Sequence, residues 1–308
     1  MNKRELGRSG IFVAPFCLGG NVFGWTADES TSFSILDSFV GAGFDFIDTA
    51  DGYSAWVPGH EGGESEAVIG RWLKAHGGRE RIIIGTKVGM WQRHPGLRVA
   101  NIIAACEGSL KRLQTDYIDL YQAHRDDAET PLDETLEAFS RLITGGKVRA
   151  IGASNYEAPR LSEALEVAAA RGRPRYETLQ PLYNLVDRDF EIALQPICMR
   201  ENIGVIPYYT LAAGFLTGKY RSEADLSGRA RGGTIARYLK PEKLAQLAKL
   251  DAVANARGVS MAEIAFAWLR DRPAVVAPIA STTNLDQLTS LVRGAALTLT
   301  PQEIAALG

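Results

Sequence analysis

The sequence predicts a single (β/α)8 barrel that spans residues 1–308. Eight short apolar or β-branched runs end at polar positions, and nearly every run is followed by a segment with helical periodicity. The run ends are spaced by about 30 residues, the length of a strand–helix unit, except at the last step. An open doubly wound sheet would usually carry G-x-G-x-x-G after its first strand, and that spacing is absent. The predicted strands are residues 14–20, 44–48, 81–87, 117–124, 148–155, 177–180, 204–209 and 274–281.

Three further segments complete the barrel. Residues 4–13 contain two short strand-like pieces around Gly7 and Gly10, which predicts an N-terminal β-hairpin closing the end opposite the active face. About 72 residues separate the ends of the seventh and eighth strands, so a long loop rich in Gly and Arg, residues 211–239, is expected over the barrel. A shorter excursion, residues 53–65, follows the second strand. Loops after barrel strands open on the face where active sites lie, so both are functional candidates.

Two helix starts have the spacing of a capping box, in which side chain and backbone bond reciprocally. Ser260 with Glu263 heads an apolar helix, and Thr300 with Glu303 heads the last helix. These pairs predict where the final helices begin.

Composition and charge exclude several classes of protein. With 46% hydrophobic and 23% charged residues the chain is expected to fold, and a net charge of -2 gives no global field for nucleic acid or an anionic membrane. No apolar run approaches the ~18 residues of a membrane span, and the N-terminus has no apolar signal region. The cysteines Cys17, Cys106 and Cys198 lack metal-site or disulfide spacing. We therefore expect a cytoplasmic protein without a metal.

Ionisable residues stand at the ends of three successive strands. Asp48, Lys87 and His124 would point into the mouth of the barrel, although each alone is typical of a cap, a surface charge or a core histidine. Tyr53 follows five residues after Asp48. A tyrosine has a pKa of about 10, which an adjacent ammonium lowers, while a carboxylate keeps that ammonium charged. This set suits protonation of a carbonyl oxygen, but it needs a hydride from a cofactor.

The remaining strand ends carry neutral polar groups suited to a nicotinamide. Ser154, Asn155 and Gln180 can hydrogen-bond a carboxamide, and Tyr208 offers a ring face for stacking. Residues 214–220 supply backbone amides and Lys219 for a pyrophosphate. The segment is not a P-loop, because its glycines have three residues between them instead of four.

Seven motifs together resemble the aldo-keto reductase family over essentially the whole chain. Each is weak alone, but all occur in family order and spacing. They are FIDTADGYS, IIIGTKVG, YIDLYQAHRDD, GKVRAIGASNY, LQPLYNLVDR, VIPYYTLAAGFLTGKY and PIASTTNLDQL. The resemblance implies a barrel that binds NADPH across its mouth and reduces aldehydes or ketones reversibly, with a small-molecule carbonyl or alcohol as substrate. The family's catalytic tetrad falls on Asp48, Tyr53, Lys87 and His124.

The resemblance to the family also implies a set of residues that contact the cofactor. They are Gly20, Asn21, Asp48, Ser154, Asn155, Gln180, Tyr208, Leu211, Gly214, Leu216, Gly218, Lys219, Ala280, Ser281, Thr283 and Gln287. Many family members place Arg or Lys after strand eight to bind the 2′-phosphate of NADP, whereas residues 281–284 are uncharged. Arg229 or Arg231 in the long loop could compensate. NADP(H) is therefore the expected cofactor, and NAD(H) remains open.

The substrate pocket is expected to be wide and partly aromatic. Trp25, Trp56 and Trp91 follow strands one, two and three, where they could surround the carbonyl or simply pack under a loop. The chain ends soon after residue 307, so the long C-terminal loop that narrows the pocket in some members of the family is expected to be missing.

Two rival functions stay open at this point. Barrels of the same family also serve as non-catalytic regulatory subunits of potassium channels, which sense nicotinamide nucleotides. A glycosidase would need two carboxylates across the mouth, for which Asp126 or Asp127 would have to face Asp48. Turnover of NADPH with aldehydes separates the first rival from a reductase.

Overall fold

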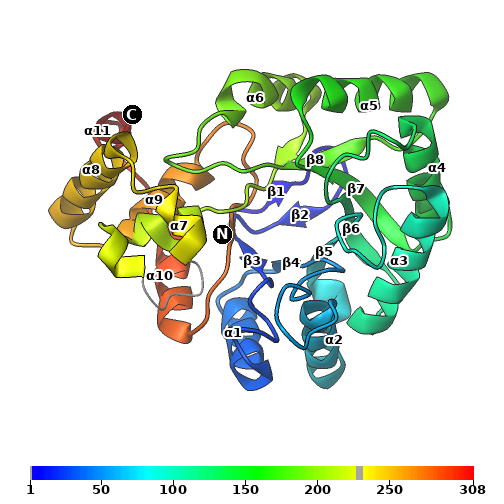
Figure 1. Ribbon diagram of the computed structural model, residues 1–308, viewed down its shortest axis with the longest axis horizontal. Coiled ribbons are helices and arrows are strands. Elements are labelled where there is room, and N and C mark those ends of the chain that lie inside the picture. Colours follow the sequence, from blue (N-terminus) through cyan, green and yellow to red (C-terminus); the bar gives the residue numbers. More distant parts are fainter. Residues whose placement is uncertain (1, 227–231) are drawn as a thin grey trace.

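A computed structural model describes residues 2–226 and 232–308, and it shows eight parallel strands curled into a (β/α)8 barrel with flanking helices (Figure 1). All eight predicted strands are confirmed. They are β3 (Cys17–Gly19), β4 (Phe46–Asp48), β5 (Ile83–Val88), β6 (Ile118–Ala123), β7 (Val148–Ser154), β8 (Tyr176–Gln180), β9 (Gly204–Val205) and β10 (Ile279–Ala280).

The strands follow one another around the ring in chain order. The sheet runs β10-β3-β4-β5-β6-β7-β8-β9 with every neighbouring pair parallel. Backbone bonds close the gap between the two ends of this sheet: the amide of Val276 donates to the carbonyl of Val205 (2.8 Å), and that of Ile279 to Pro207 (2.9 Å). Because all strands are parallel, their carboxyl ends meet at one rim.

Helices cover the outside of the barrel (Figure 1). They are α1 (Glu29–Gly41), α2 (Glu64–His76), α3 (Val99–Leu113), α4 (Leu132–Thr144), α5 (Ala158–Arg171), α6 (Phe190–Glu201), α7 (Gly232–Ala236), α8 (Pro241–Arg257), α9 (Met261–Arg270), α10 (Leu285–Ala296) and α11 (Pro301–Leu307), with short 3-10 turns η1 (Arg79–Arg81), η2 (Ala212–Thr217) and η3 (Glu223–Leu226).

The apolar side chains divide into two cores because strand residues alternate between the two faces of the sheet. Leu120 of β6 belongs to the core inside the barrel, together with Phe46 and Ile83. Its neighbour Tyr121 belongs to the core between sheet and helices, where its ring meets Phe139 of α4 edge-on at 5.7 Å. Strand residues that continue the inward face beyond Leu120 therefore reach the mouth of the barrel.

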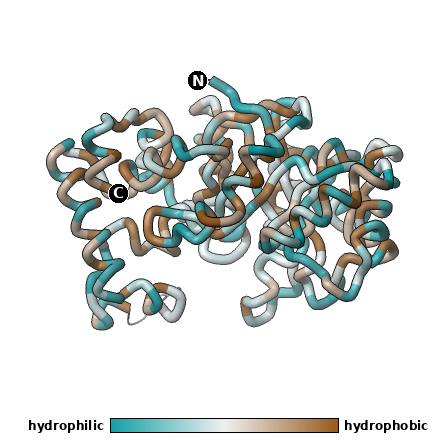
Figure 2. Tube along the Cα trace, turned by 90° about the horizontal axis from the view of Figure 1, so that it is seen from above, coloured by the Kyte–Doolittle hydropathy of each residue, from teal (hydrophilic) through white to brown (hydrophobic). Residues whose placement is uncertain are grey.

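The N-terminal hairpin is confirmed, with β1 (Arg4–Glu5) antiparallel to β2 (Phe12–Val13). Seen from above in Figure 2, the hydrophilic start of the chain projects from the edge of the molecule. Lys3 forms an ion pair with Asp45 (2.6 Å), just before β4, so the hairpin lies at the amino ends of the strands. Gly7 has φ 65°, and a Cβ there would lie 2.2 Å from the carbonyl oxygen of Glu177, so only glycine fits.

The excursion between β9 and β10 is more ordered than predicted. Its described residues form η2, η3, α7 and the 17-residue helix α8 before α9 begins. Pro241 in the first turn of α8 and Gly258 just after its end are typical helix boundaries. The sequence therefore contained evidence for this helix. The expected loop, residues 211–239, contains only the short pieces η2, η3 and α7 in its described part, and the additional helix α8 follows it.

The two predicted capping boxes differ in outcome. At Thr300 both reciprocal bonds with Glu303 are present. Ser260 caps α9 by accepting from the Glu263 amide, but the Glu263 carboxylate binds Arg293 instead of returning to the cap. Among residues 2–226 and 232–308, no helix has the length and apolar character needed to cross a membrane.

Candidate active site

A cleft of about 1430 Å³ lies at the carboxyl ends of the strands. Strand ends contribute Asp48, His124 and Gln180 to its lining, and segments after β4 and β9 contribute Tyr53 and Tyr208. The cleft is therefore built by the rim and the loops that the sequence singled out. Within the described ranges, no group of three His, Cys, Asp or Glu side chains is arranged to hold a metal ion.

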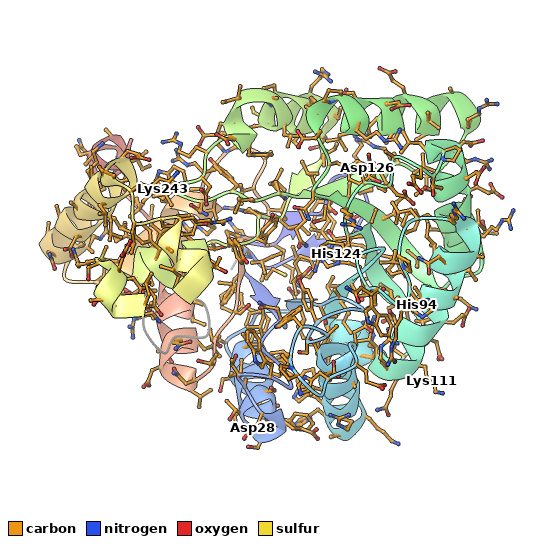
Figure 3. All side chains as sticks on the ribbon, viewed as in Figure 1. Asp28, His94, Lys111, His124, Asp126 and Lys243 are labelled. Carbon is orange, nitrogen blue, oxygen red and sulfur yellow. The ribbon has the colours of Figure 1, made fainter. Side chains whose placement is uncertain are left out.

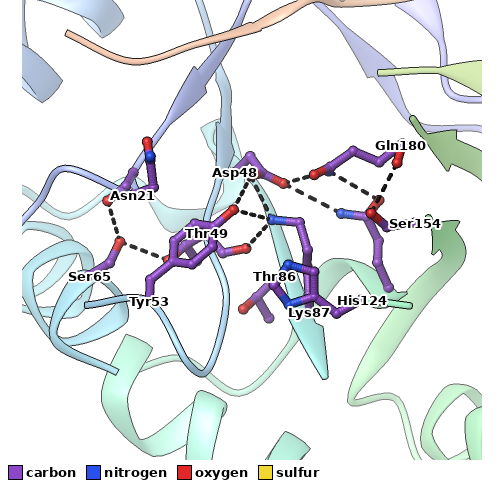
Figure 4. A network of polar contacts seen from close by, with 12 residues as sticks. Asn21, Asp48, Thr49, Tyr53, Ser65, Thr86, Lys87, His124, Ser154 and Gln180 are labelled. Atoms are coloured by element: carbon purple, nitrogen blue, oxygen red, sulfur yellow. Dashed lines mark hydrogen bonds and ion pairs between the residues drawn. The ribbon is translucent and has the colours of Figure 1, made fainter. Parts of the chain in front are cut away.

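Lys87 is the centre of a polar network at the base of the cleft (Figure 4). Its Nζ donates to Asp48 Oδ2 (2.7 Å) and to the hydroxyl oxygen of Tyr53 (2.9 Å). A third bond goes to the carbonyl of Thr49 (2.7 Å). The side chains of Lys87 and Asp48 are 0% and 1% exposed. All three donor positions of the ammonium are thus satisfied inside the protein.

His124 completes the group. Its ring centroid lies 6.0 Å from that of Tyr53 in an edge-on arrangement, and it borders the cleft. The four side chains that the sequence placed on three strand ends and one loop therefore converge on one spot.

Asp48 has further partners that the sequence reasoning missed. Gln180 Nε2 donates to Asp48 Oδ1 at 2.9 Å, and Gln122 Nε2 approaches the same oxygen at 3.5 Å. Gln122 lies two residues before His124, so the period of two along β6 would have placed both on the inward face. The predicted carboxamide ligand Gln180 thus also positions the carboxylate.

Burial and charge act in opposite directions on the pKa values of this group. Burial disfavours the Lys87 ammonium, but Asp48 and Tyr53 outweigh it and raise its pKa. Burial also raises the pKa of Tyr53; Lys87 lowers it, as expected from the sequence, but the net direction is upward. Burial, Lys87 and Arg125 lower the pKa of His124 well below its ordinary value. At neutral pH the site holds a charged lysine beside a neutral phenol and a neutral imidazole.

Asn155 connects His124 and Ser154 to Tyr208 through hydrogen bonds. It has a left-handed backbone, φ 55°, and its Nδ2 donates to the carbonyl of His124 (3.0 Å) and to Ser154 Oγ (3.1 Å). Its Oδ1 accepts from the hydroxyl of Tyr208 (2.9 Å), which fixes the orientation of that ring. Asn155, Ser154 and Tyr208 are therefore held as one unit beside the tetrad.

The turn η2 and the lysine that follows it line another part of the cleft. Ala212, Ala213 and Gly214 all have positive φ (48°, 58° and 105°), but the amides of Ala212 and Gly214 donate within the loop, to the carbonyls of Tyr209 (2.7 Å) and Leu211 (2.8 Å). Lys219 also lines the cleft and forms no ion pair with a described residue. The amide and hydroxyl side chains near His124, the fixed Tyr208 ring and the Lys219 ammonium fit a nicotinamide dinucleotide.

Uncharged, mostly polar residues form the described lining of the cleft around the segment after β10. Ala280, Ser281, Thr283 and Gln287 line it as predicted. Ser281 Oγ donates to Asn21 Oδ1, and the amide of Thr283 donates to Gln287 Oε1 (3.0 Å). Arg229 and Arg231, the proposed substitutes for a phosphate-binding cation, lie outside the described residues.

A match across almost the whole chain decides the family. The model of the Aldo/keto reductase family matches residues 15–308. The chain belongs to the aldo/keto reductase family. As a member of that family it is an oxidoreductase, in a family that uses nicotinamide nucleotides for carbonyl reduction.

Curated relatives are similar to this chain over most of their length. This aldo/keto reductase is 36% identical to the "Uncharacterized oxidoreductase YrpG" of Bacillus subtilis, over 97% of this chain and 92% of the relative. It is 35% identical to the "Aldo-keto reductase YhdN" of the same organism, over 86% and 78% of the two chains. It is 31% identical to "Norsolorinic acid reductase B" of Dothistroma septosporum, over 99% and 80%.

Some predicted cofactor contacts of this aldo/keto reductase lie away from the cleft wall. Leu211 and Gly214 line the cleft, but Leu216 is buried in the core between sheet and helices. Gly218 packs against α9, because a Cβ there would lie 2.4 Å from the sulfur of Met261. Asn21 lines the cleft, whereas Gly20 packs where a Cβ would lie 2.8 Å from Ser65 Oγ.

The three tryptophans near the mouth have different environments. Trp56 is 52% exposed and lines the cleft. Trp91 borders the cleft with its indole nitrogen bound to the carbonyl of Glu61 (3.1 Å). Trp25 is not in the described lining and packs edge-on against Trp56, with ring centroids 5.7 Å apart. Loop residues that the sequence reasoning missed at this end are His60, Glu61, Met90, Gln92, Arg93 and Arg125.

The carboxylates required by the glycosidase alternative do not face Asp48. Asp126 is bound by Arg160 Nε, 3.0 Å from each oxygen. Asp127 accepts from the Leu97 amide (2.8 Å) and the Thr130 hydroxyl (2.7 Å). Neither aspartate is in the described lining of the cleft. The geometry therefore gives no pair of carboxylates across the mouth.

Proposed function

We propose that this protein reduces aldehydes and ketones to alcohols, reversibly, with NADP(H) or NAD(H) as cofactor and Tyr53 as the proton donor. The observation that carries the proposal is the position of Lys87 Nζ, which donates both to Asp48 and to the hydroxyl oxygen of Tyr53 at the base of the cleft. Two of the relatives are named as reductases, which is consistent with this assignment.

The network prepares Tyr53 to give up its proton. Because Lys87 donates to the phenolic oxygen, the hydroxyl proton is free to point elsewhere, and its contact with Asp48 is long at 3.4 Å. The neutral phenol is the form that donates, and the ammonium stabilises the phenolate left behind. Asp48 keeps the ammonium charged in a buried position.

The other residues position the reactants. The neutral imidazole of His124 can hold the carbonyl oxygen near Tyr53. Ser154, Asn155 and Gln180 would bind the carboxamide of the cofactor, and Tyr208 would stack on its ring. When bound, the nicotinamide supplies a hydride to the carbonyl carbon. Lys219, which lines the cleft, would hold the pyrophosphate.

A Tyr53→Phe variant tests the role of the acid. Removing the hydroxyl deletes the proton donor but keeps the ring, so turnover should fall by about 10²–10⁴-fold while cofactor affinity stays within about twofold. Steady-state reduction of an aldehyde panel and fluorescence titration with NADPH measure the two quantities. Tyr117→Phe removes a hydroxyl outside the cleft lining and is the matched control.

Three outcomes separate the candidates. A Tyr53→Phe rate within a few-fold of wild type would show that another group is the acid. Nucleotide binding without turnover in the wild-type protein would favour the nucleotide-sensing subunit. Titration with NADH alongside NADPH addresses the cofactor, since equal affinities would show that the uncharged segment 281–284 does not recognise a 2′-phosphate.

A further inference from the structure

Arg125 is a cation in the lining of the cleft that has no ion-pair partner among residues 2–226 and 232–308. It follows His124 directly, lines the cleft and is exposed. Its guanidinium forms no hydrogen bond or ion pair with any residue that the structure describes. The neighbouring cations differ: Arg93, also in the lining, is paired with Glu61 (3.0 Å), and Lys87 is paired with Asp48 (2.7 Å).

The carboxylates closest in sequence are bound by other partners. Asp126 is held by Arg160, and Asp127 caps the turn formed by residues 127–130. Figure 3 shows Asp126 displaced from His124 toward the outer helices. The charge of Arg125 nevertheless acts on the site, because Arg125 contributes, after burial and Lys87, to the lowered pKa of His124. A charge that the protein leaves unpaired beside its own reaction centre is available to a ligand.

We propose that Arg125 is a specificity-determining residue that selects carbonyl substrates carrying an anionic group, a carboxylate or a phosphate. This inference rests on the proposed reductase function and names the substrate class of the same cleft. A guanidinium matches both anions because its planar fork donates two parallel hydrogen bonds.

The rest of this end of the cleft fits an apolar body between the carbonyl and the anion. Trp56 and Met90 both line the cleft, and their side chains are 52% and 46% exposed. Exposed apolar surface of this kind favours a hydrophobic contact. Tyr53 and His124 at the base would contact the carbonyl oxygen, and Arg125 would contact the anionic group at the other end of the substrate.

A set of three aldehydes of equal ring size tests the inference. They are para-formylbenzoate, its neutral methyl ester, and para-formylphenyl phosphate. In the wild type, kcat/KM should be higher for an anion than for the ester. In Arg125→Gln, the anion-to-ester ratio of kcat/KM should fall about fivefold, the scale of one exposed ion pair, mainly through KM. Added NaCl should lower the same ratio in the wild type, because salt screens an exposed charge pair.

Arg171→Gln is the matched control, since Arg171 is exposed at the end of α5, has no described partner and does not line the cleft. Its anion-to-ester ratio should equal that of the wild type. Of the carboxylate and the phosphate, the one with the larger ratio of kcat/KM relative to the ester is the preferred group. If Arg125→Gln leaves both ratios unchanged while the ester is turned over, the inference is wrong and the reductase function stands. If no aldehyde is turned over, both fail.

Discussion

Asp48 and Asp51 are three residues apart in one segment and both are buried, but the regions around them differ. Asp48 faces the barrel interior, where Lys87 and Gln180 donate to its oxygens. Among the described residues no side chain donates to either oxygen of Asp51, and the adjacent backbone amide of Gly52 gives its charge only weak support. The fold therefore supplies side-chain partners to the carboxylate that holds Lys87, and supplies none to the other from the residues that the structure describes.

Burial and nearby charges together explain why Asp51 keeps its proton. Burial, and then the carboxylate of Glu66 in α2, raise its pKa to about 8 against the smaller opposing effects of Arg112, the Gly52 backbone amide and Lys87. Arg112 of α3 is already bound to Glu66 (2.7 Å), as is the Thr86 hydroxyl (2.5 Å). Asp51 is thus a neutral acid at neutral pH. One buried aspartate is stabilised by pairing and the other by keeping its proton.

The largest loss of stability is expected when Asp48 loses the lysine that pairs with it. Lys87→Met leaves Asp48 as a buried charge without its cation, which should lower the free energy of unfolding by about 3–5 kcal/mol and abolish turnover. Urea denaturation measures the first quantity. Lys74→Met, at an exposed position without a described partner, is the control. The double variant with Asp48→Asn should recover part of the stability, and no recovery would show that the loss is not electrostatic.

Replacing Asp51 should change the stability of the protein in the opposite direction. The unfolded chain loses the Asp51 proton above about pH 4, whereas the folded chain keeps it up to about 8. The wild type therefore loses stability from this group as the pH rises between these values, and Asp51→Asn does not. The variant should match the wild type near pH 4 and be more stable by about 2–4 kcal/mol at pH 9, less than full linkage because the new amide also needs partners.

Urea denaturation across this pH range measures that difference, with Asp116→Asn at an exposed site as the control. A difference between Asp51→Asn and wild type that does not grow with pH would mean that Asp51 is ionised in the folded protein. A variant less stable than wild type at every pH would mean that Asp51 has partners that the structure does not show.

The contrast between these aspartates also shows how far sequence reasoning reaches. Parallel strands bring their carboxyl ends to one rim, so the positions of Asp48, Lys87 and His124 at strand ends were enough to predict that they meet. The burial that reverses the net pKa shift of Tyr53 depends on packing, which spacing along the chain does not report.

Partners contributed by distant segments were the least predictable features. Trp25 and Trp56 both follow strands, but only the structure shows that Trp56 lies between Trp25 and the cleft. Asp126, the neighbour of Arg125 in the chain, binds Arg160, which is 34 positions away. Composition and periodicity carry no information about such choices, because several partners of equal chemistry compete for each charge.

The smallest effect tests how much of the stability around Asp48 comes from its neutral donors. Gln180→Met keeps the volume but removes the bond to Asp48 Oδ1. Because Lys87 remains and Gln122 is close enough to strengthen its contact, the loss in unfolding free energy should be about 1 kcal/mol, well below that of Lys87→Met. Gln302→Met, exposed and without a described bond, is the control for urea denaturation. A loss as large as that of Lys87→Met would show that Asp48 depends on its amide donor as much as on its cation, and the distinction between charged and neutral partners would no longer hold.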